Sequence, residues 1–385
     1  MKVVEVIAGL KTAPEVCQQL AAFAKVMGQE WKAVGIRGMY GYMADLATEP
    51  RWYRVHETFT EDADLGANIM KTLVENLQGG PLNPASPVAL TMKHFPGGGP
   101  QELGLDPHYA FGKNQVYPAG NFGYHLKPFK AAIDAGVSSI MPYYGVPIDV
   151  TYEGVRYEQT GMAFSRQIVT DLLRGKLGFK GYVNSDTGIV NDRAWGLEGK
   201  SVPERVATAI NGGTDTLSGF SDVKTITDLV KAGLVSEARV TEAAKRLLTP
   251  LFQMGLFENP YVDEARANAL VGSEANRNLG LELQRKSIVL LQNQGSGTAK
   301  ALPVAAGAKV YTMGLDSADA NKYFAQAVNG EADAEGKPLA RDAAGNVQGR
   351  PSAAGFDRAI IRVEITNGGT NGYRSKDPAT GANPA

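Results

Sequence analysis

Helix-like and strand-like segments alternate along the chain up to about Gly255. Apolar residues recur at helical spacing in some segments, and short apolar runs of about five residues, the usual strand length, lie between them. The predicted helices are 13–30, 64–77, 125–135, 165–177, 202–211, 223–232 and 240–254, and the predicted strands are 33–36, 88–92, 138–142, 182–184 and 214–217. This alternation predicts βα units around a parallel sheet, and therefore an α/β fold of the TIM-barrel type.

The pattern changes after Gly255. The segment GLFENPYVD is rich in turn residues, and Gly295–Thr298 is typical of a flexible linker. Two later apolar runs, AKVYTMG and FDRAIIRVEI, predict strands of a second α/β unit, and the stretch 333–355 between them predicts a long exposed loop. We therefore expect a barrel, a linker and a second unit, spanning residues 1–275, 276–305 and 306–385.

Composition narrows the classes of function. The net charge is −1, from 39 basic and 40 acidic residues, so it gives no electrostatic reason to expect binding to nucleic acid or to an anionic membrane. The single cysteine, Cys17, excludes an internal disulfide, and the four histidines show no metal-ligand spacing. No phosphate-loop motif follows the glycine run at 97–99. We expect neither a metal nor a cofactor.

The segment GFKGYVNSD, residues 178–186, places a carboxylate after a short apolar strand. In a barrel of parallel strands, the carboxyl ends of the strands line the active site. Asp186 is therefore a candidate catalytic residue. Its position alone leaves a second interpretation equally open, because Asp also commonly caps the helix that follows a strand.

A second candidate segment, KHFPGGGP, follows the predicted strand 88–92. Lys93 and His94 supply hydrogen-bond donors suited to neighbouring hydroxyl groups, and the three glycines let the backbone approach a ligand closely. A Lys-His pair with no further context would usually be an accident of the surface.

Several motifs occur in the order that is typical of glycoside hydrolase family 3. They are RWYRVHETFTED, LQGG, KHFPGGGP, GFKGYVNSD, the turn GGTD, GLFENPY and RKSIVLLQN. The chain resembles the β-glucosidase-like branch of this family, in which a TIM-type (β/α)8 barrel precedes an α/β sandwich. The resemblance implies a retaining exo-β-glycosidase that needs no cofactor and acts on β-linked oligosaccharides or glycosides.

The resemblance assigns roles to individual residues. Asp186 matches the nucleophile, Lys93 and His94 match the residues that hold the sugar beside it, and Arg54 matches an arginine that contacts sugar hydroxyls. Tyr144 matches a tyrosine next to the nucleophile, where its hydroxyl could hydrogen-bond the carboxylate. Trp195 follows Asp186 closely and either stacks on a sugar ring or is buried.

The acid/base group is less clearly marked. Two-domain members of the family supply a Glu from the second domain, whereas one-domain members use an Asp-x-His pair on the loop after the KHFPG motif. Asp106-Pro107-His108 lies on that loop, two residues farther from Lys93 than in the one-domain pattern. We take Asp106 and His108 as a candidate dyad, with substrate binding by the loop as the alternative.

Two departures from the family pattern concern the ends of the chain. The sequence begins after the position of the family's first strand, and the second domain is shorter than the family's sandwich, so we expect a barrel without its first strand and an incomplete sandwich. A homodimer could complete such a site. The compartment stays open, although a periplasmic or secreted parent protein fits the family. The alternative functions are a β-N-acetylhexosaminidase or phosphorylase that uses the dyad, and a carbohydrate-binding fragment without turnover.

Overall fold

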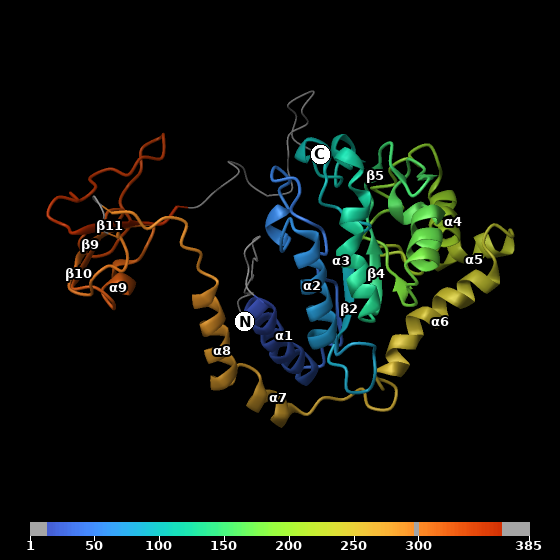
Figure 1. Cartoon of the computed structure of the whole chain (residues 1–385), viewed down its shortest axis with the longest axis horizontal. Coiled ribbons are helices and arrows are strands. Elements are labelled where there is room, and N and C mark those ends of the chain that lie inside the picture. Colours follow the sequence, from blue (N-terminus) through green and yellow to red (C-terminus); the bar gives the residue numbers. More distant parts are fainter. Residues whose placement is uncertain (1–13, 296–299, 364–385) are drawn as a thin grey trace. The chain divides into compact units, whose positions relative to one another are not determined.

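The computed structural model describes residues 14–295 and 300–363. These residues divide into two compact units, one reaching Ser287 and one beginning at Ile288 (Figure 1). None of the described helices has the length and apolar content needed to cross a bilayer.

The first unit is an α/β barrel of the TIM type, built on parallel strands that neighbour each other in chain order. The strands β1 (Gly38–Met39), β2 (Ala89–Phe95), β4 (Ser139–Pro142) and β8 (Tyr182–Val183) form one sheet in the order β1-β2-β4-β8. A parallel bridge between Asn184 and Thr216 continues that order by one position. Because all pairings are parallel, the carboxyl ends of these strands share one edge.

Helices pack around the sheet, and the hydrophobic pattern predicts all of those described in the first unit except the last two. They are α1 (Pro14–Ala33), α2 (Ala63–Leu73) with the π-helical turn η2 (Val74–Gln78), α3 (Phe122–Asp134), η7 (Gln167–Lys176), α4 (Val202–Gly212), α5 (Val223–Lys231), α6 (Glu237–Gln253), α7 (Glu264–Leu270) and α8 (Glu274–Lys286). Side-chain caps begin several of them: Asp62 accepts hydrogen bonds from two amides of α2, and Ser201 and Glu204 form a capping box on α4.

Short elements complete the first unit. They are η1 (Val55–Glu57), η3 (Glu102–Gly104), η4 (Ala110–Gly112), β3 (Asn114–Gln115), η5 (Pro118–Gly120), β5 (Val146–Pro147), β6 (Thr151–Tyr152), β7 (Val155–Arg156) and η6 (Met162–Phe164). β3 pairs with β5, and β6 pairs with β7. Most of these elements lie on the loops that follow β2 and β4, so the carboxyl edge of the sheet carries the more elaborate connections.

The predicted strand at 33–36 is wrong. Helix α1 continues to Ala33, and Gly35 adopts a left-handed conformation that ends it, so the strand begins only at Gly38. The apolar side chains that suggested a strand, Val34 and Ile36, are 48% and 45% exposed. The predicted strand at 214–217 is reduced to the single bridge at Thr216.

The core of the first unit lies between the sheet and its helices. Leu90, Met92 and Phe95 of β2 are fully buried, and Phe95 meets Phe129 of α3 edge to face at 5.4 Å. Figure 1 shows α2 and α3 side by side along β2 and β4. Side chains on both faces of β2 are therefore buried, as expected for a strand in the wall of a barrel.

Asp215 connects three elements near the start of β8. Its buried carboxylate accepts hydrogen bonds from Arg174 of η7 at 2.6 Å, from Arg239 and Arg246 of α6 at 2.8 and 3.1 Å, and from the Val183 amide at 2.9 Å. A buried carboxylate is tolerated only when donors surround it in this way. The contacts fasten η7 and α6 to the last strand of the sheet.

The second unit is a small parallel sheet. The strands β9 (Lys309–Met313), β10 (Gln326–Asn329) and β11 (Arg358–Ile361) lie in the order β10-β9-β11, with the short helix α9 (Ser317–Ala320) between β9 and β10. Its buried core consists of Ala308, Val310 and Ala327. The sequence predicts β9 and β11 but not β10, which contributes only two apolar residues. Residues 333–355 form mostly exposed turns, as expected.

We expect the Asp215→Asn variant to lower the free energy of unfolding by about 3–5 kcal/mol, because it leaves three partly buried guanidinium groups without the fully buried carboxylate that they share. Urea unfolding would measure the change. The matched control is Asp64→Asn, since Asp64 forms an exposed pair with Lys127 and should lose less than about 1 kcal/mol. Equal losses in the two variants would contradict a structural role for Asp215.

His125 of α3 makes stability depend on pH. Burial lowers the pKa of His125 from 6.5 to about 4. Between these values the unfolded chain binds more protons than the folded one, so stability falls as the pH falls from 6.5 toward 4, by up to about 3 kcal/mol. The difference in unfolding free energy between the protein and a His125→Gln variant should show this slope. Parallel pH profiles for the two proteins would contradict the assignment.

Candidate active site

Asp186 lies just beyond β8, at the carboxyl edge of the sheet. Its Oδ1 accepts a hydrogen bond from the Thr187 amide at 2.6 Å, and its Oδ2 lies 3.7 Å from Nε2 of His94. The side chain is 18% exposed. A turn follows it, and the next described helix, α4, is capped by Ser201. The helix-cap interpretation of Asp186 is therefore wrong, and the carboxylate opens onto the end of the barrel.

His94, near the end of β2, is buried beside Asp186. Its Nδ1 lies 2.8 Å from Oδ2 of Asp45, and its Nε2 lies 3.5 Å from Nη1 of Arg54. Burial lowers the pKa of His94, although the Asp45 carboxylate acts in the opposite direction. The ring is therefore neutral near pH 7.

Lys93 is the other polar residue of this part of β2. Its Nζ lies 5.2 Å from the centre of the Tyr40 ring, a cation–π distance. Burial lowers the pKa of Lys93, and the positive charge of Arg54 lowers it further. The two cations thus lie near each other in a partly closed space, a setting that attracts electron-rich oxygen atoms.

Arg54 is held by a fork-like ion pair with Glu57. The Nε and Nη2 atoms of Arg54 each lie 2.8 Å from a carboxylate oxygen of Glu57. Burial alone would raise the pKa of Glu57, but the hydrogen bonds and charge of Arg54 lower it overall. Glu57 therefore stays ionised and orients the guanidinium, whose remaining Nη1 faces His94.

Asp106 and His108 form a dyad on the loop after β2. Nδ1 of His108 makes a short hydrogen bond with Asp106 Oδ1, and the Trp52 indole donates to Asp106 Oδ2 at 2.7 Å. Burial would raise the pKa of Asp106, but these donors lower it overall. The Trp195 indole is 9% exposed and donates to the Pro107 carbonyl at 2.7 Å, so the structure favours the buried alternative for Trp195.

Tyr144, just after β4, contacts His108 of the dyad. Its hydroxyl lies 3.0 and 3.1 Å from the two ring nitrogens of His108, whereas the sequence led us to expect a hydrogen bond to Asp186. Burial raises the pKa of Tyr144, and the charges of Asp106 and Asp186 raise it further. The Tyr144 ring also meets His94 edge-on at 6.4 Å. The Tyr144 ring thus lies beside His108 and His94, two of the site residues that the sequence predicts.

The glycine run 97–99 is buried against the protein itself. A Cβ at Gly97 would lie 2.8 Å from the Cβ of His125, and one at Gly99 would overlap the carbonyl oxygen of Leu46. We expected the glycines to let the backbone approach a ligand. The structure shows that they also let this loop pack against α3 and the segment after β1.

The residues described above at the carboxyl edge form a polar cluster: Arg54, Glu57, Lys93, His94, Asp106, His108, Tyr144, Asp186 and Trp195. Asp45 belongs to this cluster, although the motifs did not single it out. It is fully buried and accepts hydrogen bonds from the His94 backbone amide, from Nδ1 of that ring and from the Gly98 amide. The signal in the sequence is weak: Asp45 is one acidic residue within the otherwise apolar run 43–46. Only the fold reveals that this run ends beside His94.

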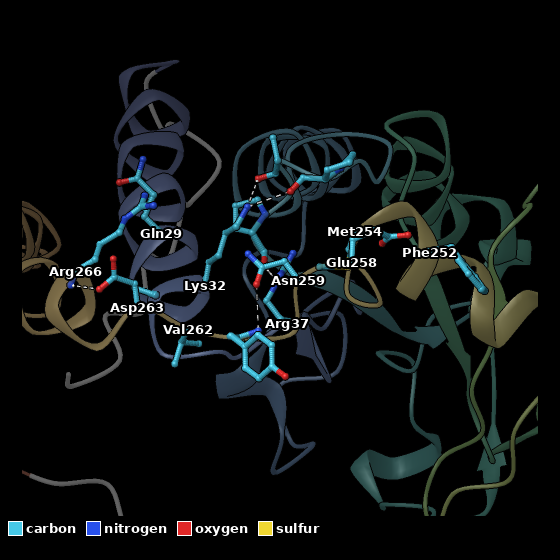
Figure 2. A pocket seen from close by; sticks show the side chains of 16 residues that line it. Gln29, Lys32, Arg37, Phe252, Met254, Glu258, Asn259, Val262, Asp263 and Arg266 are labelled. Carbon is cyan, nitrogen blue, oxygen red and sulfur yellow. Dashed lines mark hydrogen bonds between the residues drawn. The ribbon is translucent and has the colours of Figure 1, made fainter.

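A separate cavity of about 910 Å³ lies between the end of α1, the loop 84–87 and residues 252–266 (Figure 2). Figure 2 shows Lys32 and Arg37 at its wall. Lys32 donates to carbonyl oxygens of the loop at 3.2 and 3.0 Å, and Arg37 does so at 2.9 and 3.0 Å. The loop precedes β2, so the cavity lies at the amino ends of the strands, opposite the edge where barrels carry out chemistry.

The described residues contain no group of three or more His, Cys, Asp or Glu side chains arranged to hold a metal ion. The polar cluster consists instead of carboxylates, imidazoles, cations and a phenol. Such a set can supply a nucleophile, a proton donor and hydrogen bonds to several hydroxyl groups.

The sequence model of the Glycosyl hydrolase family 3 N terminal domain matches residues 8–250. Among curated proteins, Beta-glucosidase C of Emericella nidulans is 42% identical over 329 residues, which cover 82% of this chain and 52% of the relative. The Periplasmic beta-glucosidase/beta-xylosidase of Dickeya chrysanthemi is 36% identical, with 76% and 47% covered. The chain spans about half the length of these relatives.

Solved structures give the same picture of the fold. A β-glucosidase from Erythrobacter marinus is 30% identical, with a TM-score of 0.64 over 78% of this chain and 38% of that one. A mutant β-glucosidase from Listeria innocua, solved in complex with laminaribiose, has a TM-score of 0.69 at 23% identity, over 81% of this chain and 45% of that one.

The matched family domain extends over most of the first unit and contains every residue of the polar cluster, from Asp45 to Trp195. The order of the parallel strands and the position of Asp186 after β8 agree with that match. The chain therefore belongs to glycosyl hydrolase family 3.

Proposed function

We propose that this protein is a retaining exo-β-glycosidase of the β-glucosidase type, with Asp186 as its nucleophile. One observation carries the proposal: the partly exposed Asp186 carboxylate stands at the carboxyl edge of the barrel, with Oδ2 beyond hydrogen-bond distance of His94. A substrate atom can therefore reach this oxygen. The names of the relatives support a β-linked glucoside or related glycoside as the substrate.

In the proposed reaction, Asp186 Oδ2 attacks the anomeric carbon while an acid protonates the departing glycosidic oxygen. Water then attacks the covalent glycosyl-enzyme and restores the carboxylate, so the configuration of the sugar is retained. Lys93, His94 and Arg54 hold the hydroxyl groups of the sugar. The Glu57 pair keeps the guanidinium of Arg54 in a fixed orientation, which favours directional hydrogen bonds.

We propose the Asp106–His108 dyad as the acid/base. Asp106 is ionised and buried, so it fixes the orientation of His108, whose side chain is 19% exposed. Trp195 holds the loop through Pro107, and the Tyr144 hydroxyl contacts His108. The dyad also supports the second candidate function, a β-N-acetylhexosaminidase or phosphorylase.

The division of the chain is proposed as a barrel domain at 1–275, a linker at 276–305 and a partial α/β sandwich domain at 306–385. The boundary between the two compact units lies between Ser287 and Ile288. This position falls within the proposed linker and supports the division. Homodimerisation stays a prediction.

Incubation with a 2-fluoro glucosyl fluoride should label Asp186, because the fluorine slows hydrolysis of the glycosyl-enzyme more than its formation. Peptide mapping by mass spectrometry would locate the label. Asp186→Asn should abolish labelling and reduce turnover by about 10⁴-fold or more, the scale expected for loss of an essential nucleophile. The control is Asp192→Asn, an exposed carboxylate on the same turn, which should keep both.

A label on another carboxylate would contradict the nucleophile assignment. A folded protein that binds glucosides in calorimetry but acquires no label would favour the third alternative, a binding protein without turnover.

His108→Ala should reduce turnover of substrates with poor leaving groups by about 10²–10⁴-fold, because their oxygen depends on proton donation. Substrates with activated leaving groups should still form the glycosyl-enzyme, and azide should accelerate its release. The control, His56→Ala, removes an exposed imidazole outside the cluster. If azide leaves the rate of the His108 variant unchanged, the dyad is not the acid/base.

A further inference from the structure

Asp45 carries a buried negative charge that is stabilised by hydrogen bonds. Its side chain is fully buried, and within residues 14–295 and 300–363 no Lys or Arg forms an ion pair with it. The charge is stabilised by hydrogen bonds: the His94 amide lies 3.2 and 3.1 Å from its two oxygens, Nδ1 of the His94 ring lies 2.8 Å from Oδ2, and the Gly98 amide donates to Oδ1. A buried carboxylate is costly unless hydrogen bonds or an ion pair compensate for its lost hydration.

These contacts determine the tautomer of His94. A carboxylate only accepts hydrogen bonds, so Nδ1 must carry the proton, and in the neutral ring Nε2 is then a hydrogen-bond acceptor. Arg54 Nη1, a donor, lies 3.5 Å from Nε2, which agrees with that assignment. Nε2 also lies 3.7 Å from Asp186 Oδ2, so a substrate hydroxyl at Asp186 would lie close to it.

The same carboxylate fixes the loop after β2. Its Oδ1 holds the Gly98 amide, while Gln115 Nε2 and the Tyr117 hydroxyl each donate to the Gly97 carbonyl at 2.9 Å. A single buried group thus sets both the imidazole and the backbone next to it.

We propose that Asp45 is a positioning residue that holds His94 in the Nδ1–H tautomer, so that Nε2 accepts a hydrogen bond from a substrate hydroxyl next to Asp186. The effect on substrate rests on the proposed function. The tautomer does not, and it can be measured without any substrate.

The first test is a ¹H–¹⁵N correlation spectrum of the imidazole groups in the full chain. The chain has four histidines, so His94 can be assigned by comparison with a His94→Gln variant. We expect protonated Nδ1 and unprotonated Nε2 in the wild type near pH 7. A protonated Nε2 on a neutral His94 would overturn the proposal, whatever the protein catalyses.

The second test is Asp45→Asn, which keeps the shape of the side chain. The amides of His94 and Gly98 require an acceptor and should take the new carbonyl oxygen, which turns the NH₂ group toward Nδ1. Nδ1 must then accept and Nε2 must carry the proton. The control is Tyr117→Phe, which removes a hydrogen bond from the loop but should leave the Nδ1–H tautomer. An unchanged His94 spectrum in the folded Asp45→Asn variant would overturn the proposal.

The kinetic consequence should be specific to His94. In metal sites, loss of the carboxylate that orients a histidine commonly costs about 10–100-fold, and by analogy we expect kcat/KM of Asp45→Asn to fall by a similar factor. In a His94→Ala background the same substitution should have little further effect. A full additive loss would mean that Asp45 acts through the general fold. If the tautomer changes as expected but no variant or wild type turns over a glycoside, the proposed function fails and the positioning role stands.

Discussion

The shared edge of the parallel sheet is the constraint on which the rest of the site depends. Asp45 follows β1, His94 ends β2, Tyr144 follows β4 and Asp186 follows β8. Because neighbouring strands run in the same direction and in chain order, residues separated by about 140 positions arrive at one end of the barrel. The helices and the loop contacts adjust this arrangement but do not create it.

Buried acids organise the two ends of the barrel in different ways. At the start of β8, Asp215 is surrounded by three arginines that tie helices to the sheet. At the other end, Asp45 and Asp106 accept hydrogen bonds from a histidine each, with backbone amides and a tryptophan completing their shells. Full cationic partners suit stability, whereas imidazole partners leave a nitrogen available for chemistry. Asp186, the most exposed of the four acids, has no histidine within hydrogen-bond distance of its Oδ2.

Local sequence patterns and tertiary contacts carry different kinds of information about this fold. Helical periodicity located the helices of the first unit up to α6 but not α7 and α8, because an amphipathic helix with a clearly buried face shows that face in the sequence itself. The apolar run 33–36 misled, because Val34 and Ile36 are exposed at the end of α1 rather than buried in the sheet. The glycines at 97–99 were interpreted as allowing a ligand to approach the backbone, whereas their protein neighbours are Leu46 and His125, which no local pattern could identify.

The sequence by itself determined the alternation of helices and strands, the family and the identity of the polar residues at strand ends, since these are properties of local periodicity and of contiguous motifs. Only the tertiary structure decided what those residues touch. In the structure, the Tyr144 hydroxyl contacts His108, the Trp195 indole is buried and donates to the Pro107 carbonyl of the dyad loop, and Asp45 hydrogen-bonds His94. Each of these contacts joins segments that are distant in the chain, and their geometry follows from strand register and loop packing, which a linear pattern does not contain.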